Sequence, residues 1–221
     1  MTYCSPNGEE GYPGQVILTV TYSVTENNEL RIEYNGTTDR PTILNPTHHS
    51  YFNLTGSFEQ TILDHLLTIE SDCITEVEEG MIPTGKFIDV SNTPMDFCTP
   101  YAVGLRIQEN YNQLKLGNGY DHNWVLRNYN RSIREVARLY EPKSRRLMTV
   151  STDQPGLQFY SGNYLHGLVS GKKDIRYQRR TGLCLETQFF PDSPNKPKFP
   201  SVVLKSKDTY RQTTIYKFSI G

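Results

Sequence analysis

Alanine is almost absent from this sequence. The 221 residues include two alanines, Ala102 and Ala137, against 22 threonines, 15 tyrosines and 9 phenylalanines. Alanine has the highest helix propensity, whereas threonine and the aromatic residues favour the pleated, half-buried surface of a sheet. Another 16 glycines and 13 prolines supply frequent chain breaks. The composition therefore predicts an all-β protein.

An excess of charge and long apolar runs are also missing. Lys and Arg total 23 and Asp and Glu total 24, for a formal charge of −1, so the chain lacks the positive field that attracts nucleic acid. No apolar run approaches the roughly 20 residues that cross a bilayer. Residues 1–6 lack the basic and then apolar pattern of a secretory signal. We expect no nucleic-acid partner, no membrane and a cytoplasmic location.

Cysteine is sparse and widely spaced. Cys4, Cys73, Cys98 and Cys184 lie 69, 25 and 86 positions apart, so the chain has neither a Cys-x-x-Cys pair of the kind that binds zinc nor the dense framework of small disulfide-rich domains. The spacing predicts four free thiols and no metal site.

Alternation of apolar and polar residues places the strands. Residues 15–24 and 29–38 form the clearest hairpin, because the second run alternates with the period of a sheet that has one wet face. Further strands are expected at residues 65–70, 86–90, 123–127, 135–140, 146–152, 157–160, 183–189 and 209–220. Residues 101–114 are the one candidate for a short helix, and the proline-rich residues 191–200 predict a loop or an extended segment. Many short strands indicate one sandwich or barrel domain over residues 1–221.

Residues 45–54, Asn-Pro-Thr-His-His-Ser-Tyr-Phe-Asn-Leu, concentrate polar side chains. In an extended segment the adjacent His48 and His49 point to opposite faces. They would therefore chelate an ion poorly, and we expect one to face a cleft and the other to be structural.

Three more segments carry candidate chemistry. Asp121 precedes the only tryptophan, and it either caps a turn or contacts a sugar beside aromatic rings. Glu186 shares a strand face with Cys184, so it is either solvated or buried in a pocket that raises its pKa toward the range of a general base. Gln158 lies among amide and hydroxyl groups, which match the donors and acceptors of a sugar hydroxyl.

Taken in order, these motifs resemble the aldose 1-epimerase (galactose mutarotase) family. The similar segments are residues 5–14, 45–54, 119–123, 158–163 and 185–200. The resemblance implies an all-β, galactose mutarotase-like supersandwich with its site in a cleft on one sheet. It also implies that the reaction requires no metal or other cofactor.

The resemblance assigns His49 as general acid and Glu186 as general base. It assigns sugar contacts to four further residues: Ser50, Tyr51, Asp121 and Gln158. The implied activity interconverts the α and β anomers of hexoses such as glucose and galactose by ring opening and reclosure. It requires a protonated His49, which a nearby carboxylate favours, and predicts a bell-shaped dependence of rate on pH.

The sequence departs from the family pattern at several positions. The family has a segment before the position of Ser5 with a Gly-Arg…Asn-Arg motif and a Leu-His-Gly-Gly motif, and neither occurs here, so we expect an N-terminally truncated form of the domain. His48 replaces an asparagine, Pro46 replaces a leucine, and His166 does not match the second motif. Sheet edges left unpaired favour self-association or pairing with another chain.

Three alternatives remain open at this stage. The first is a catalytically weak, carbohydrate-binding β-sandwich that keeps Asp121 and Gln158. The second is a glycosidase that uses Asp121 and Glu186 as paired carboxylates. The third is an epimerase of hexose 6-phosphates, for which the arginines within residues 176–180 form the nearest basic cluster.

Overall fold

Two antiparallel sheets make up most of the computed structural model, which describes residues 1–168 and 170–221. The larger sheet has eight strands in the order β1-β2-β3-β15-β11-β10-β5-β8. Their bounds are Thr2–Ser5 (β1), Val16–Val24 (β2), Glu29–Thr38 (β3), Leu66–Ile69 (β5), Tyr101–Ala102 (β8), Arg134–Glu141 (β10), Arg146–Thr152 (β11) and Tyr210–Ile220 (β15). Its long central strands β3 and β15 pair over eight residues.

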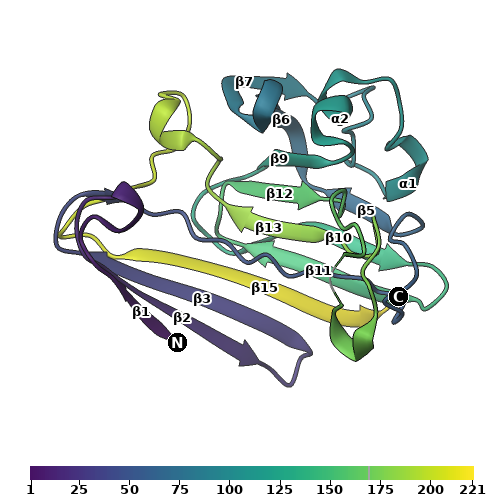
Figure 1. Cartoon of the computed structure of the whole chain (residues 1–221), viewed down its shortest axis with the longest axis horizontal. Coiled ribbons are helices and arrows are strands. Elements are labelled where there is room, and N and C mark those ends of the chain that lie inside the picture. Colours follow the sequence, from purple (N-terminus) through teal and green to yellow (C-terminus); the bar gives the residue numbers. More distant parts are fainter. Residues whose placement is uncertain (169) are drawn as a thin grey trace.

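The smaller sheet has five strands in the order β13-β12-β9-β6-β7. Their bounds are Ser71–Val77 (β6), Pro83–Asp89 (β7), Asp121–Leu126 (β9), Gly156–Tyr160 (β12) and Cys184–Gln188 (β13). A third, two-stranded sheet pairs β4, Thr42–Ile43, with β14, Val203–Leu204. In Figure 1, β1 to β3 form one flank of the molecule, and β6 and β7 lie at the opposite end.

Short helices occupy the connections. Two are α-helical, α1 at Val103–Arg106 and α2 at Asn112–Gly117. Four are 3₁₀ turns: η1 at Glu9–Gly11, η2 at Glu79–Met81, η3 at Lys172–Asp174 and η4 at Ser193–Asn195. Among the described residues, no helix is long and apolar enough to cross a membrane.

The core lies between the two sheets because strand alternation turns one face of each strand inward. In β12, Leu157 and Phe159 are fully buried in the core, whereas Gln158 and Tyr160 lie on the outer face. Phe159 packs against Trp124 of β9, whose indole N–H donates to the Met95 carbonyl at 3.1 Å. This bond satisfies the one polar group of a ring that is otherwise buried in apolar surroundings.

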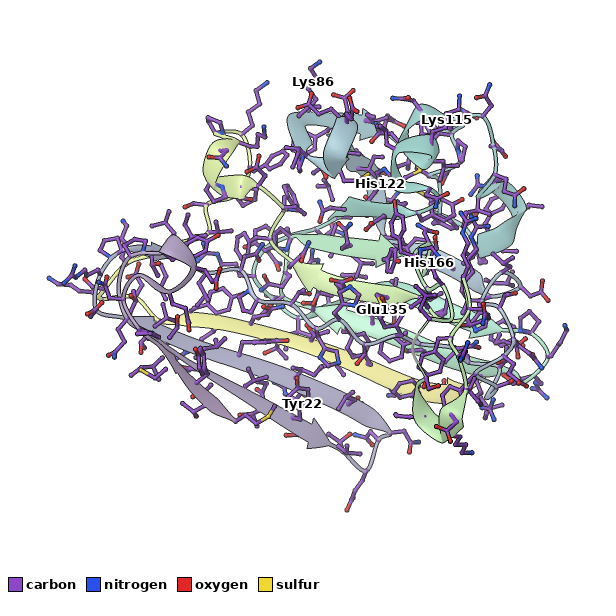
Figure 2. All side chains as sticks on the ribbon, in the orientation of Figure 1. Tyr22, Lys86, Lys115, His122, Glu135 and His166 are labelled. Atoms are coloured by element: carbon purple, nitrogen blue, oxygen red, sulfur yellow. The ribbon has the colours of Figure 1, made fainter. Side chains whose placement is uncertain are left out.

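Strand β13 lies over β15 of the larger sheet, and side chains of the larger sheet cover its free edge. Tyr216 donates its hydroxyl to the Leu185 carbonyl at 2.7 Å, and Gln212 donates its amide to the Thr187 carbonyl at 2.8 Å. The β13 edge of the five-stranded sheet therefore does not present a row of unpaired backbone carbonyl groups. Figure 2 places Tyr22, on β2, and Lys86, on β7, at opposite ends of the molecule.

The prediction of an all-β antiparallel sandwich is confirmed. The expected hairpin is β2 with β3, and each further predicted strand coincides with an observed one to within about three residues at either end. The four thiols are free, as predicted. The stretch 101–114, expected to hold a short helix, contains α1 and the start of α2, together with β8 and a turn.

Candidate active site

The outer face of the five-stranded sheet carries two aligned rows of polar side chains. Antiparallel pairing sets Gln158 of β12 opposite Glu186 of β13, and Tyr160 opposite both Cys184 of β13 and Asp121 of β9. Residues that are directly opposite on one face lie close enough for their side chains to interact. The register thus brings two carboxylates, an amide, a thiol and a phenol to one surface.

An extended segment follows the edge of β13 and adds a histidine to this surface. The Asn45 side chain exchanges two hydrogen bonds with the Phe189 backbone, at 3.0 and 2.9 Å. Thr47 donates its hydroxyl to the Thr187 carbonyl at 3.0 Å. These contacts fix residues 45–47 against the sheet, so the position of His49 two residues later is set by β13.

The two adjacent histidines face opposite sides, as expected for an extended segment. The His48 ring lies between the rings of Tyr22 and Tyr216, at 5.7 and 6.0 Å between centroids. Ser50, which shares the side of His48, has its Oγ 2.6 Å from His48 Nε2. The polar groups on this side of the segment are therefore engaged with one another.

His49 points to the other side and meets the acidic residue of β13. Its Nε2 lies 3.3 Å from Glu186 Oε1, and its Nδ1 lies 3.3 Å from Cys184 Sγ. The His49 side chain is 51% exposed and that of Glu186 is 8% exposed. The rings of Tyr51 and Tyr160 lie 5.2 and 6.1 Å from the imidazole. A solvent-accessible imidazole therefore contacts a buried carboxyl group beside two aromatic rings.

Burial controls the electrostatics of the group. It raises the pKa of the Glu186 carboxyl to about 7, against the opposing attraction of His49 and with a smaller contribution from the negative charge of Asp121. Burial also raises the pKa of Asp121, although the hydrogen bond from Gln158 opposes the shift. The Cys184 thiol has a raised pKa for the same reason. A carboxyl poised near neutrality is suited to accept and return a proton.

Asp121 and Gln158 form a second pair next to this group. Gln158 Nε2 donates to Asp121 Oδ1 at 2.8 Å. The other amide atom, Oε1, is buried without a hydrogen-bond partner among the residues described. Both side chains line a cavity of about 100 Å³ together with Asn123. A buried acceptor without a partner is costly, and a ligand hydroxyl would satisfy it.

The structure brings most of the residues selected from the sequence together. His49, Tyr51 and Glu186 lie in one group, and the sheet register connects Asp121 and Gln158 to it. The hydroxyl of the sixth residue, Ser50, is bonded to His48. Ser50 and Tyr51 also line a separate cavity of about 730 Å³.

Sequence reasoning selected neither Cys184 nor Tyr160 as a site residue, although it placed Cys184 on the strand face of Glu186. The signal for both was available, since each lies two residues from a selected residue on the same strand and therefore on the same face. Tyr160 is two positions after Gln158, and Cys184 is two before Glu186. The thiol matters further because His49, Cys184 and Glu186 have the donor atoms of a three-ligand metal site.

Of the three arginines considered for phosphate binding, Arg179 is bonded to another loop and Arg180 is buried. Arg179 donates to the backbone carbonyl and the side-chain oxygen of Asn118, at 2.9 and 2.7 Å. Arg180 is 6% exposed, and burial lowers its pKa. Neither is in contact with Glu186 among the interactions of the described chain, so no observation favours a hexose 6-phosphate.

Comparison with known proteins places these residues in a family context. The family model for aldose 1-epimerase matches residues 1–217. The galactose mutarotase of Bos taurus is 42% identical over 217 residues, which are 98% of this chain and 61% of that protein. The aldose 1-epimerase of Escherichia coli K12 is 35% identical over 97% of this chain and 62% of its own length. The chain thus spans about three fifths of these relatives.

Solved structures share the fold. A GalM/aldose epimerase homologue from C. elegans superimposes with a TM-score of 0.87 and 31% identity, over 99% of this chain and 64% of the other. A galactose 1-epimerase from Lactobacillus acidophilus gives a TM-score of 0.85 and 26% identity, over 100% of this chain and 62% of the other. The prediction of a galactose mutarotase-like sandwich is confirmed.

Proposed function

Because this chain belongs to the aldose 1-epimerase family, we propose that its own residues interconvert the α and β anomers of an aldohexose such as glucose or galactose. Relatives that are 42% and 35% identical carry the names galactose mutarotase and aldose 1-epimerase. The chain covers 61% of the length of the galactose mutarotase, so the proposal concerns the residues of this chain alone.

One observation carries the proposal: His49 Nε2 lies 3.3 Å from Glu186 Oε1. The anomeric hydroxyl and the ring oxygen of a hexose are bonded to the same carbon atom. A catalyst that removes a proton from one and adds a proton to the other therefore needs an acid and a base close together. The His49 and Glu186 side chains meet this requirement. His49 is half exposed and Glu186 is buried, which suits the first as the acid and the second as the base.

In the ring-opening step the Glu186 carboxylate accepts the proton of the anomeric hydroxyl. The protonated imidazole of His49 donates its Nε2 proton to the ring oxygen as the bond between that oxygen and carbon 1 breaks. The products are an open-chain aldehyde, a Glu186 carboxylic acid and a neutral His49. Each positioned proton transfer contributes about 10²- to 10⁴-fold in rate.

Rotation about the bond between carbons 1 and 2 then presents the other face of the aldehyde. In ring closure His49 takes the proton of the carbon 5 hydroxyl while that oxygen attacks carbon 1. Glu186 returns its proton to the former carbonyl oxygen. Both side chains regain their starting protonation states, and the configuration at carbon 1 is inverted.

The neighbouring residues supply the contacts of a sugar site. Asp121 accepts hydrogen bonds, and Gln158 offers the free acceptor Oε1 to a ligand hydroxyl. The rings of Tyr51 and Tyr160 lie 6.1 Å apart beside His49, and aromatic faces pack well against the apolar C–H faces of a pyranose. The substrate class that fits is a small neutral sugar.

Polarimetry of freshly dissolved α-D-glucose and α-D-galactose tests the proposal. We expect the protein to bring the optical rotation to equilibrium faster than buffer alone. Glu186→Gln should lower the protein-catalysed rate at least about 100-fold. Glu26→Gln, in the exposed turn between β2 and β3, is the matched control and should retain full activity. A wild-type rate equal to that in buffer, together with measurable sugar binding, would instead identify a carbohydrate-binding sandwich.

A further inference from the structure

The side chains of His49, Cys184 and Glu186 form a cluster that the proposed reaction does not fully use. Their ligand atoms, one from each residue, all lie within 4.8 Å of one another. Among residues 1–168 and 170–221, this is the one group of three or more His, Cys, Asp or Glu side chains with that property. We propose that these three residues bind a single divalent cation of the zinc class.

The donor set matches zinc chemistry. Imidazole nitrogen, thiolate sulfur and carboxylate oxygen are the ligand types that Zn²⁺ takes in proteins, and sites with three protein ligands leave a fourth position open. Hard cations such as Mg²⁺ and Ca²⁺ prefer oxygen donors alone. A site with one nitrogen, one sulfur and one carboxylate therefore favours Zn²⁺ and its analogues Co²⁺ and Cd²⁺ over Mg²⁺ and Ca²⁺.

The spacing is close to that of a coordinated site. Bond lengths of about 2.0 Å to nitrogen and about 2.3 Å to sulfur, at a tetrahedral angle, place those two ligand atoms about 3.6 Å apart. His49 Nδ1 and Cys184 Sγ are 3.3 Å apart. Only one imidazole nitrogen binds the ion. The distances between the three ligand atoms, which are at most 4.8 Å, must therefore shorten by about 1 Å to reach the spacing of a tetrahedral site.

The protein framework can supply this adjustment. Cys184 and Glu186 are two residues apart on β13, so they project from one face of a strand that pairs with β12 on one side and receives side-chain hydrogen bonds from Thr47 and Tyr216 on the other. His49 lies on a segment without regular secondary structure, and its side chain is 51% exposed. The two buried ligands are therefore pre-positioned, and the adjustment falls to the exposed His49 side chain, which an incoming ion reaches from solvent.

Binding follows a balanced exchange. The ion loses coordinated water, the Cys184 thiol and the protonated imidazole of His49 each release a proton to solvent, and bonds from the metal to sulfur, nitrogen and oxygen form without oxidation or reduction. The bound ion then coordinates His49 and Glu186, so these side chains are no longer available for the proton transfers of the proposed reaction. Under the proposed function, zinc would therefore compete with the sugar and inhibit the reaction. That consequence rests on the proposed function, whereas binding of the ion does not.

The test uses purified protein without a histidine tag, titrated with Co²⁺ under nitrogen. A thiolate bound to Co²⁺ gives a near-ultraviolet charge-transfer band, which reports on the sulfur ligand whether or not the protein has activity. We expect this band to saturate at one equivalent and to disappear on addition of Zn²⁺. Absence of the band in the wild-type protein would overturn the proposal.

Matched cysteine variants identify the ligand. Cys184→Ala should abolish the band and weaken Zn²⁺ binding at least about 100-fold, whereas Cys73→Ala and Cys98→Ala, at half-buried free thiols, should leave both unchanged. A band that survives Cys184→Ala overturns the assignment. Should Cys184→Ala fail to fold, His49→Gln changes an exposed side chain and must show a similar loss of Zn²⁺ affinity, and unchanged affinity overturns the site.

The two proposals fail separately. Sugar at saturating concentration should raise the apparent dissociation constant of Zn²⁺ if both are correct. A protein that binds Co²⁺ through Cys184 but does not accelerate mutarotation would refute the proposed activity and leave the metal site intact. A protein that accelerates mutarotation but shows no cobalt–thiolate band would refute the metal site and leave the proposed activity intact.

Discussion

Gln158 donates a side-chain N–H to the Asp121 carboxylate at 2.8 Å from β12, the strand that lies between Asp121 on β9 and Glu186 on β13. The amide thus stands between the half-buried carboxyl of Asp121 and the buried carboxyl of Glu186. One N–H of this amide is used by Asp121, and its acceptor oxygen has no partner among the described residues. One side chain therefore orients a ligand-binding carboxylate and offers a free acceptor of its own.

Replacement of Gln158 should impair binding more than chemistry. Gln158→Leu keeps similar volume but removes both polar groups, so we expect kcat/KM for α-D-galactose to fall about 10- to 100-fold, as for loss of a hydrogen bond to a charged group. The loss should appear mainly as a higher KM. Gln108→Leu, at an exposed position, should match the wild type. A fall in kcat at constant KM would place Gln158 in the chemical step instead.

The buried carboxylate predicts the acidic limb of the pH profile. Glu186 acts as base only when ionised, and burial raises its pKa to about 7. The enzymatic rate should therefore fall as the pH drops below about 7, by roughly tenfold per unit well below that value. Polarimetry at constant ionic strength, with the rate in buffer subtracted at each pH, measures this. A constant rate between about pH 7 and pH 5 would remove Glu186 from the role of base.

Strands with clean alternation were predictable, and strands without it were not. Strand β11, Arg146–Thr152, was predicted to the residue. Strand β6, Ser71–Val77, was missed because its pairing shifts register twice, between Ser71 and Cys73 and between Thr75 and Val77. Each shift breaks the two-residue period that marks a strand in sequence. Strand β1 is mostly exposed, so it carries no alternation either.

The candidate site was predictable in composition but not in contacts. Alternation alone puts Cys184 and Glu186 on one face, and the register agrees. The burial of Glu186 depends on how a distant segment is held against β13, which no local pattern encodes. The pairing of Gln158 with Asp121 likewise depends on the strand order β13-β12-β9. Motif resemblance assigned these residues to one sugar site, but neither it nor periodicity predicted the burial of Glu186 or the pairing of Gln158 with Asp121.

The covered edge of β13 predicts a stability effect. Tyr216 is fully buried and donates its hydroxyl to the Leu185 carbonyl, next to Glu186. Tyr216→Phe keeps the ring but leaves this carbonyl without that donor, so the free energy of unfolding should fall by about 1–3 kcal/mol. Urea unfolding monitored by fluorescence measures the change. Tyr12→Phe, at a 51% exposed ring, is the control, and equal stability of both variants would show that the bond contributes nothing net.

Buried His65 predicts how stability depends on pH. Its Nε2 accepts the Leu54 N–H at 2.9 Å, and burial lowers its pKa from 6.5 to about 4. As the pH falls below about 6.5 the unfolded chain takes up the proton first, so folding loses stability between about pH 6.5 and pH 4. Between about pH 7.5 and pH 5 this group alone should remove about 2 kcal/mol.

His65→Gln isolates this contribution, because the glutamine oxygen is an uncharged acceptor for the same N–H and does not titrate. The variant should lose about 2 kcal/mol less than the wild type when urea unfolding is compared at about pH 7.5 and pH 5. His166→Gln, at an exposed histidine, should keep the wild-type dependence. Since other groups titrate equally in all three proteins, parallel curves for wild type and His65→Gln would mean that His65 is protonated as easily in the folded chain as in the unfolded one.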